Sequence, residues 1–82
     1  MSVSYVMHLL GNCRPNDAPH IQEILTQLHA TLLANPEVRM SQQQCRIVVL
    51  YAENTQLDQA LRATLLLEMR LHYSGPELDY LF

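Results

Sequence analysis

Residues 40–52 read Met-Ser-Gln-Gln-Gln-Cys-Arg-Ile-Val-Val-Leu-Tyr-Ala, and the conformation of this stretch decides the fold class. Ser41 and Gln44 have the spacing of a capping box, in which two side chains satisfy backbone amides at a helix start. Met40 and Cys45 have the spacing of a hydrophobic staple across the same start. The rival interpretation is a buried strand, because the Ile-Val-Val-Leu-Tyr run is continuously apolar and partly β-branched. Since the helix start has two independent signals, we predict a helix; a strand here would indicate an α+β fold.

Two helices are expected before this stretch. A short one spans Ser2–Leu10, with Ser2 as its N-cap and Gly11 as its terminator. A longer one spans Ala18–Ala34, where Pro19 fits the first turn and the dipeptide Asn35-Pro36 stops the helix. Its cap is Asp17 or Ala18, and its apolar stripe consists of Ile21, Ile24, Leu25, Leu28 and Leu32.

The longest predicted helix spans about Gln56–Tyr73, with Thr55 as its cap and an acid, Asp58, in its first turn. Asp58 and Arg62 are four residues apart, which favours an ion pair. Apolar residues occupy three faces: Leu57, Leu61, Leu65, Met69 and His72 on the first, Leu66 and Tyr73 on the second, and Ala63, Leu67 and Leu71 on the third. A helix that is apolar on almost every side is surrounded by protein.

We therefore predict one all-α domain over residues 1–82, a small bundle of three principal helices plus a short N-terminal helix, assembled as a homodimer. A chain of 82 residues buries only about 60–65% of its unfolded surface, so a second subunit would enlarge a small core. Residues 75–82 are expected to form a short C-terminal tail. In the alternative to a dimer, Leu78, Leu81 and Phe82 of this tail fold back over the third apolar face.

Surplus apolar surface of this kind marks protein interfaces. Aromatic side chains are enriched among the residues that dominate interface energies. We assign Tyr51 to the core and the aromatic residues of the tail to an interface. The predicted partner-binding residues are Leu66, Leu67, Arg70, Leu71, Tyr73, Tyr80 and Phe82.

The charge pattern argues against nucleic acid and membrane partners. The net charge is −3, with eight acids, five arginines and no lysine, and the arginines are dispersed instead of forming a basic stripe. The cluster from Gln42 to Arg46 could belong to a helix-turn-helix but is better explained as a solvated helix start. No apolar run reaches the 18 residues of a membrane helix and no signal peptide is evident, so we expect a cytoplasmic protein with reduced thiols.

Catalytic and metal-binding patterns are not found in the sequence. The four histidines and two cysteines lack the spacing of a zinc site, and Gly11 and Gly75 form no phosphate-binding loop. Cys45 falls on an apolar helical stripe with Val48, Val49 and Ala52, whereas Cys13 falls in a loop and is the more accessible thiol. Glu68 and His72 could form a pair at a helix end. We expect no enzyme activity, no cofactor and no metal.

The order of these signals resembles the AriR/YmgB-type two-component connector proteins of enterobacteria, which are linked to biofilm formation and acid resistance. The resemblance covers about residues 4–78, through Ser4-Tyr5 and Gly11-Asn12, Leu25 to Leu33 with a turn ending in Val38, Glu53-Asn54-Thr55, and Leu67-Glu68 with Tyr73-Ser74. It departs where Asn35-Pro36 replaces an expected glycine and where residues 75–82 have no counterpart. The resemblance implies a helical homodimer that binds a signalling partner and performs no chemistry.

The sequence thus predicts a small regulatory protein that binds another protein and alters its activity. Two other functions remain open at this point. One is a phage- or plasmid-type inhibitor of a host or defence enzyme, and the other is a chaperone of a secreted or assembled protein. An enzyme or redox sensor that uses Cys13 is the least favoured alternative.

Overall fold

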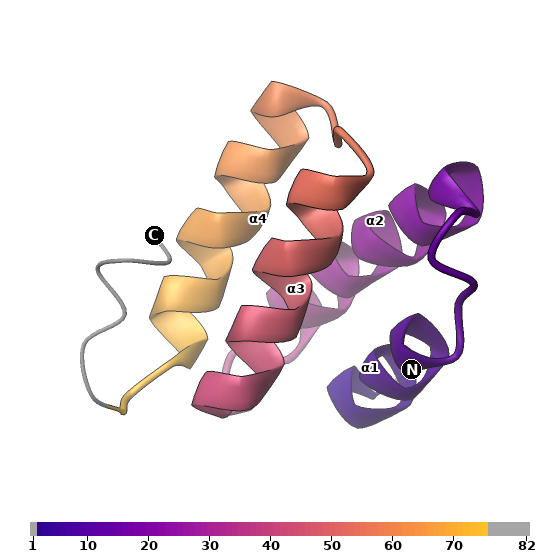
Figure 1. Ribbon diagram of the computed structural model, residues 1–82. Coiled ribbons are helices and arrows are strands. Elements are labelled where there is room, and N and C mark those ends of the chain that lie inside the picture. The colour runs from indigo at the N-terminus through magenta and orange to yellow at the C-terminus, as the bar shows by residue number, and fades with distance from the viewer. Residues whose placement is uncertain (1, 76–82) are drawn as a thin grey trace.

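The computed structural model describes residues 2–75 as four helices joined by short turns: α1 (Val3–Gly11), α2 (Ala18–Ala34), α3 (Gln42–Asn54) and α4 (Gln59–His72). Residues 2–75 contain no strand, which confirms the predicted all-α fold. The α2 helix contacts each of the other three, and α3 and α4 run antiparallel side by side across it (Figure 1). No helix in this part of the chain has both the length and the apolar character needed to cross a bilayer.

The start of α3 has the predicted capping box. The backbone N–H of Gln44 donates to Ser41 Oγ at 3.1 Å, and the backbone N–H of Ser41 donates to Gln44 Oε1 at 2.9 Å. Met40 and Cys45, the two residues of the predicted staple, are both buried. Two amides at the helix start are thereby satisfied, so the β-branched run that follows is helical and the strand alternative is wrong.

The first two helices begin as expected, and α1 ends one residue later than predicted. Ser2 Oγ accepts from the backbone N–H of Tyr5 at 3.1 Å, so Ser2 caps α1. Gly11 is the last residue of α1, and none of the described glycines has a positive φ, so no left-handed glycine ends this helix. Instead Asn12 is the C-cap, and its side-chain Nδ2 donates to the carbonyl of His8 at 2.9 Å.

The turn between α3 and α4 corrects the predicted start of the last helix. Thr55 does not cap α4, because it is the C-cap of α3 and its hydroxyl donates to the Tyr51 carbonyl at 2.8 Å. Gln56 has a φ of 52°, a left-handed conformation that ends α3. The N-cap of α4 is Asp58, whose carboxylate accepts from the backbone N–H of Leu61 at 3.2 Å. The last helix therefore begins at Gln59, three residues after the predicted start.

The predicted ion pair between Asp58 and Arg62 is also replaced by another. The guanidinium of Arg62 lies 3.2 Å from Glu53 Oε1 across the turn, and both side chains are largely exposed. An exposed pair of this kind contributes at most about 1 kcal/mol. The carboxylate of Asp58 bonds a backbone amide instead, because it stands at the helix start.

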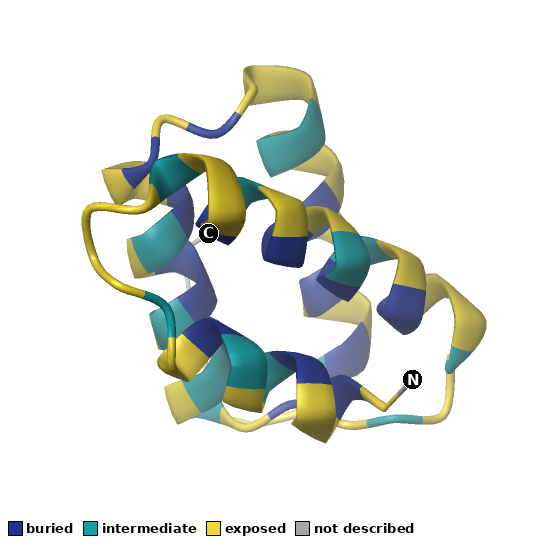
Figure 2. Ribbon diagram, turned by 90° about the vertical axis from the view of Figure 1, so that its right-hand side faces the viewer, coloured by how far each residue is buried: buried dark blue, intermediate teal, exposed yellow. Residues whose placement is uncertain are grey.

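A single apolar core fills the space between the helices. Figure 2 shows the buried positions on the inner side of every helix and the exposed positions on the outside. The buried apolar residues are Val3, Val6, Leu10, Ile21, Ile24, Leu25, Leu28, Leu32, Met40, Cys45, Val48, Val49, Ala52, Leu57, Leu65 and Met69. The predicted stripes of α2 and α3 are both confirmed by this set. On α4 the first predicted face points inward, with Leu65 and Met69 fully buried.

His72 joins the last turn of α4 to the loop before α3. Its ring is buried, with Nδ1 2.8 Å from the carbonyl oxygen of Val38 and Nε2 3.4 Å from Glu68 Oε1. Its own carbonyl accepts from the backbone N–H of Met40 at 2.8 Å. Because Val38 offers only an acceptor, Nδ1 carries the proton in this contact. The pair predicted between Glu68 and His72 is therefore present, and the histidine has a structural role.

Candidate protein interaction surface

The outer side of α4 carries a continuous uncharged surface. Leu67 and Leu71 are 62% and 69% exposed, the highest values among the large apolar residues of the described chain. Three smaller residues, Ala60, Ala63 and Thr64, are exposed on the same side. Helical spacing of three and four residues places all five in one row along the helix. We call this row the α4 stripe.

The predicted partner-binding residues divide into three groups in the structure. Leu67, Leu71 and Arg70 lie exposed on α4, the two leucines in the stripe and the arginine beside it. Leu66 and Tyr73 are partly buried and pack against the core, so they face inward more than the leucines do. Tyr80 and Phe82 lie outside the described residues. The structure thus brings Leu67 and Leu71 together and separates them from Leu66 and Tyr73.

A second exposed apolar feature lies on α3 and was not predicted from the sequence. Leu50 is 56% exposed, and the surface around it is hollowed into a groove of about 660 Å³. We call it the α3 groove; its described lining residues are Gln42, Gln43, Arg46, Ile47, Val49, Leu50 and Glu53. The signal that could have revealed it was the helical spacing itself. Ile47 and Leu50 fall off the inward stripe of α3, and in the structure Ile47 is only partly buried and Leu50 is exposed.

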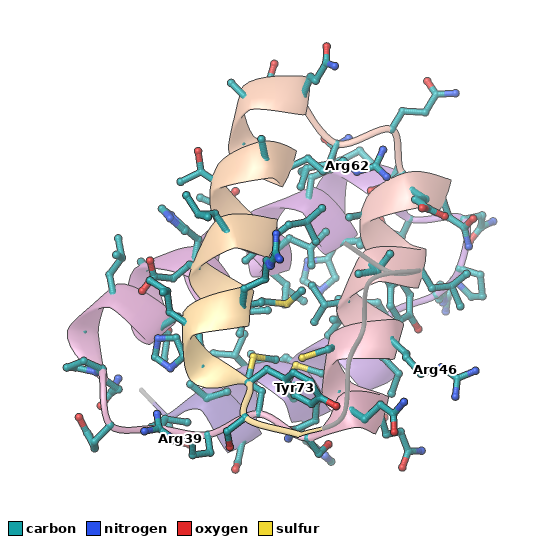
Figure 3. All side chains as sticks on the ribbon, turned by 90° about the vertical axis from the view of Figure 1, so that its left-hand side faces the viewer. Arg39, Arg46, Arg62 and Tyr73 are labelled. Carbon is teal, nitrogen blue, oxygen red and sulfur yellow. The ribbon has the colours of Figure 1, made fainter. Side chains whose placement is uncertain are left out.

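The arginines of this side of the molecule do not gather into one patch. Figure 3 shows Arg39, Arg46 and Arg62 at separate places around α3 and α4. Arg62 is engaged with Glu53, and Arg46 projects from the exposed surface of α3. A duplex-binding surface needs several cations in register with phosphates. Arg39, Arg46 and Arg62 lie apart and so do not form such a surface.

The two thiols lie in surroundings that suppress their reactivity. Burial raises the pKa of the Cys45 thiol to about 11, and the side chain is inaccessible to water. Burial and, to a smaller extent, the nearby carboxylate of Asp17 raise the pKa of the Cys13 thiol. The Cys13 thiol also donates to the carbonyl of Leu9 at 3.3 Å. Because the thiolate is the nucleophile, both environments disfavour covalent chemistry at neutral pH.

Metal ligands are not brought together by the fold within residues 2–75. No three of the described histidine, cysteine, aspartate and glutamate side chains form a group that could hold a metal ion. His72 is committed to Val38 and Glu68, and His8 lies beside Asn12 on the surface of α1. The apolar surfaces of α4 and α3 are therefore the features on which a function can be argued.

Comparisons of the chain with protein-family models, with curated proteins and with solved structures gave no match. The resemblance to the two-component connector proteins stays a prediction. The exposed apolar surfaces of this molecule are therefore the basis on which its function is inferred.

Proposed function

We propose that this chain is a non-catalytic regulatory protein of the cytoplasm that binds another protein through the α4 stripe and so alters the activity of that protein. The observation that carries the proposal is the exposure of Leu67 and Leu71 beside three small uncharged residues. Covering a leucine side chain with protein stabilises a complex by roughly 1.5–3 kcal/mol when the burial is complete. Two such leucines on one rigid helix are suitable anchors for a partner.

The sequence of the stripe also supports a second copy of the chain as one binding partner. The two leucines lie toward the end of α4, and the small residues lie toward its beginning. In an antiparallel pair related by a two-fold axis, Leu71 of one copy faces Ala60 of the other, and Leu67 faces Thr64. Large side chains then meet small ones along the whole contact, which is the self-complementarity that a two-fold interface requires.

The stripe contains no charged residue that this contact would bury. Arg70 lies next to it and Glu68 is partly buried against His72 on the opposite border. Charged residues that surround an uncharged contact form the polar rim typical of protein interfaces. We therefore include the homodimer in the proposal, with the same stripe available to the regulated protein when the dimer dissociates.

The proposal is tested with the double variant Leu67→Asp/Leu71→Asp and the matched control Tyr5→Asp. Tyr5 is a large exposed residue on α1, 51% exposed, and α1 packs on α2. Substitutions at exposed sites change stability by about 0.5 kcal/mol or less, so all three proteins should keep their helical circular dichroism. Light scattering over a concentration series should give a dimer for the wild type and for the control, and a monomer for the double variant.

Function is tested by affinity capture from the source cells with the same three proteins as baits. A partner retained by the wild type and by Tyr5→Asp, but lost with the double variant, would support the α4 stripe as the binding surface. Its activity, measured with and without the wild-type chain, should differ. A wild-type chain that stays monomeric at high micromolar concentration would end the dimer part of the proposal. If the double variant captured the same proteins as the wild type, the α4 stripe would not be the surface that binds the regulated protein.

A further inference from the structure

The α3 groove needs an occupant, because it exposes apolar side chains that the bundle does not cover. Leu50 is 56% exposed, Ile47 is partly exposed, and the buried core residue Val49 also lines the groove. The border of the groove is polar and includes Gln42, Gln43 and Arg46. An apolar floor with a polar border and one exposed cation suits an extended segment that alternates apolar with acidic side chains.

The described chain ends at the same end of the molecule as the groove. The backbone N–H of Met40 donates to the carbonyl of His72, so the last turn of α4 lies beside the residue that precedes the cap of α3. Tyr73 packs against the core, and Figure 3 shows it at the end of α4 on the side of α3. Gln42, in the first turn of α3, begins the groove two residues after Met40.

Gly75 lies against the ring of Tyr73. A Cβ atom built on Gly75 would lie 2.6 Å from the hydroxyl oxygen of Tyr73, which is inside van der Waals contact. A side chain at position 75 would therefore require the Tyr73 ring to move. Because Tyr73 packs against the core on the side of α3, the described chain ends close to this helix.

The seven residues that follow have the composition that the groove requires. They read Pro-Glu-Leu-Asp-Tyr-Leu-Phe, so acids at Glu77 and Asp79 alternate with large apolar side chains. Seven extended residues span about 23 Å, at roughly 3.3 Å each. The groove runs along α3 from Gln42 to Glu53, which is about 17 Å at 1.5 Å per residue. The segment is long enough to follow the groove, and its two acids stand at its second and fourth positions.

We infer that the α3 groove is the docking site of the chain's own residues 76–82. Their acidic side chains lie against Arg46, and their apolar side chains cover Ile47 and Leu50. Docking within one chain is favoured over docking between chains, because a short connection through Gly75 gives an effective concentration in the millimolar range. Docking of residues 76–82 on α3 leaves Leu67 and Leu71 of the α4 stripe uncovered for a partner.

This inference does not depend on the proposed function, since the two use different helices. The experiment uses the full chain and nuclear magnetic resonance. Phe82 is the only phenylalanine, so nuclear Overhauser effects from its ring to methyl groups report the position of the segment without ambiguity. We expect effects between the rings of Tyr80 and Phe82 and the methyl groups of Ile47 and Leu50.

Two variants and one control make the test specific. Leu50→Asp and Arg46→Glu should abolish these effects and shift the amide resonances of residues 77–82 toward random-coil values. Tyr5→Asp is the control, because Tyr5 is 51% exposed on α1, outside both apolar surfaces, and should leave them unchanged. The variants alter exposed side chains, and retained dispersion of the core methyl resonances will show that they fold.

Three results would overturn the inference. Random-coil shifts for residues 77–82 in the wild-type chain would show that the segment does not dock. Effects from Phe82 to Leu67 or Leu71 would place it on the α4 stripe instead. Effects that persist between labelled and unlabelled chains in an isotope-filtered experiment would show docking on a second copy.

Discussion

Gln56 offers a decisive test of the turn that sets the direction of α4. Its φ of 52° lies in the left-handed region, which costs a residue with a Cβ roughly 1–2 kcal/mol. The backbone N–H of Gln56 donates to the Glu53 carbonyl at 3.3 Å, and that of Leu57 donates to the Ala52 carbonyl at 3.2 Å. These two bonds define a Schellman motif, in which glycine is the usual residue at the left-handed position.

Replacing Gln56 by glycine should therefore stabilise the protein. Glycine removes the left-handed penalty but restores about 0.5–1 kcal/mol of backbone entropy to the unfolded chain. The net gain over alanine at this site is expected to be roughly 0.5–1 kcal/mol. In a domain of this size about 1 kcal/mol corresponds to a shift in melting temperature of 4–8 °C.

The control is to make the same two substitutions, to glycine and to alanine, at a residue inside a helix. Gln27 lies in the middle of α2, where alanine to glycine should destabilise by about 1 kcal/mol. Comparing Gln56→Gly with Gln56→Ala, and Gln27→Gly with Gln27→Ala, cancels the loss of the glutamine side chain. Urea unfolding of the four variants should give free energies of unfolding that change in opposite directions at the two sites. If alanine to glycine changed the free energy of unfolding in the same direction at both positions, the left-handed conformation of Gln56 and the Schellman motif would be refuted.

Three further predictions concern Cys45 and His72. Burial raises the pKa of the Cys45 thiol from 9.0 to about 11, which lowers its thiolate fraction at pH 8 about a hundredfold, so iodoacetamide should modify Cys13 first in the native protein. Equal rates by mass spectrometry would contradict this. Because folding raises the pKa of Cys45, the free energy of unfolding is unaffected by this group below pH 9 and falls as the pH rises from about 9 to 11. The free energy of unfolding of a Cys45→Ala variant should lack that fall. His72→Phe should cost about 1–3 kcal/mol of unfolding free energy, because it removes the hydrogen-bond donor to the Val38 carbonyl. Glu68→Gln should cost less. Equal losses in the two variants would show that His72 stabilises the fold through Glu68 and not through Val38.

Helix existence was predictable here because periodicity and caps agreed. The stripes of α2 and α3 were assigned correctly, since each needs only the positions of apolar residues every three to four places. The start of α3 was also predictable, because Ser41 and Gln44 satisfy one another locally. The start of α4 was not. Thr55 and Asp58 have capping spacing too, but the left-handed turn at Gln56 makes Asp58 the cap.

Surfaces were harder to predict than elements, because a helical pattern shows which residues share a face but not which face a neighbour covers. Leu66 and Leu67 illustrate the difference: they are adjacent in sequence, yet the first packs against the core and the second is 62% exposed. The positions of α2 and α3 beside α4 separate them. The same placement leaves Leu50 outside, although its neighbours Val48 and Val49 are buried.

The consequence is that the molecule has two apolar surfaces with different requirements. The α4 stripe is uncharged, and the small residues beside Leu67 and Leu71 allow another helix to approach closely. The α3 groove is hollow and carries Arg46 at its border, so it favours an extended acidic segment. A helical partner should therefore be sensitive to Leu71→Asp and tolerate Leu50→Asp, and docking of residues 76–82 should show the reverse. Measuring both contacts in both variants separates the two surfaces, and a single variant that disrupted both would show that they act as one.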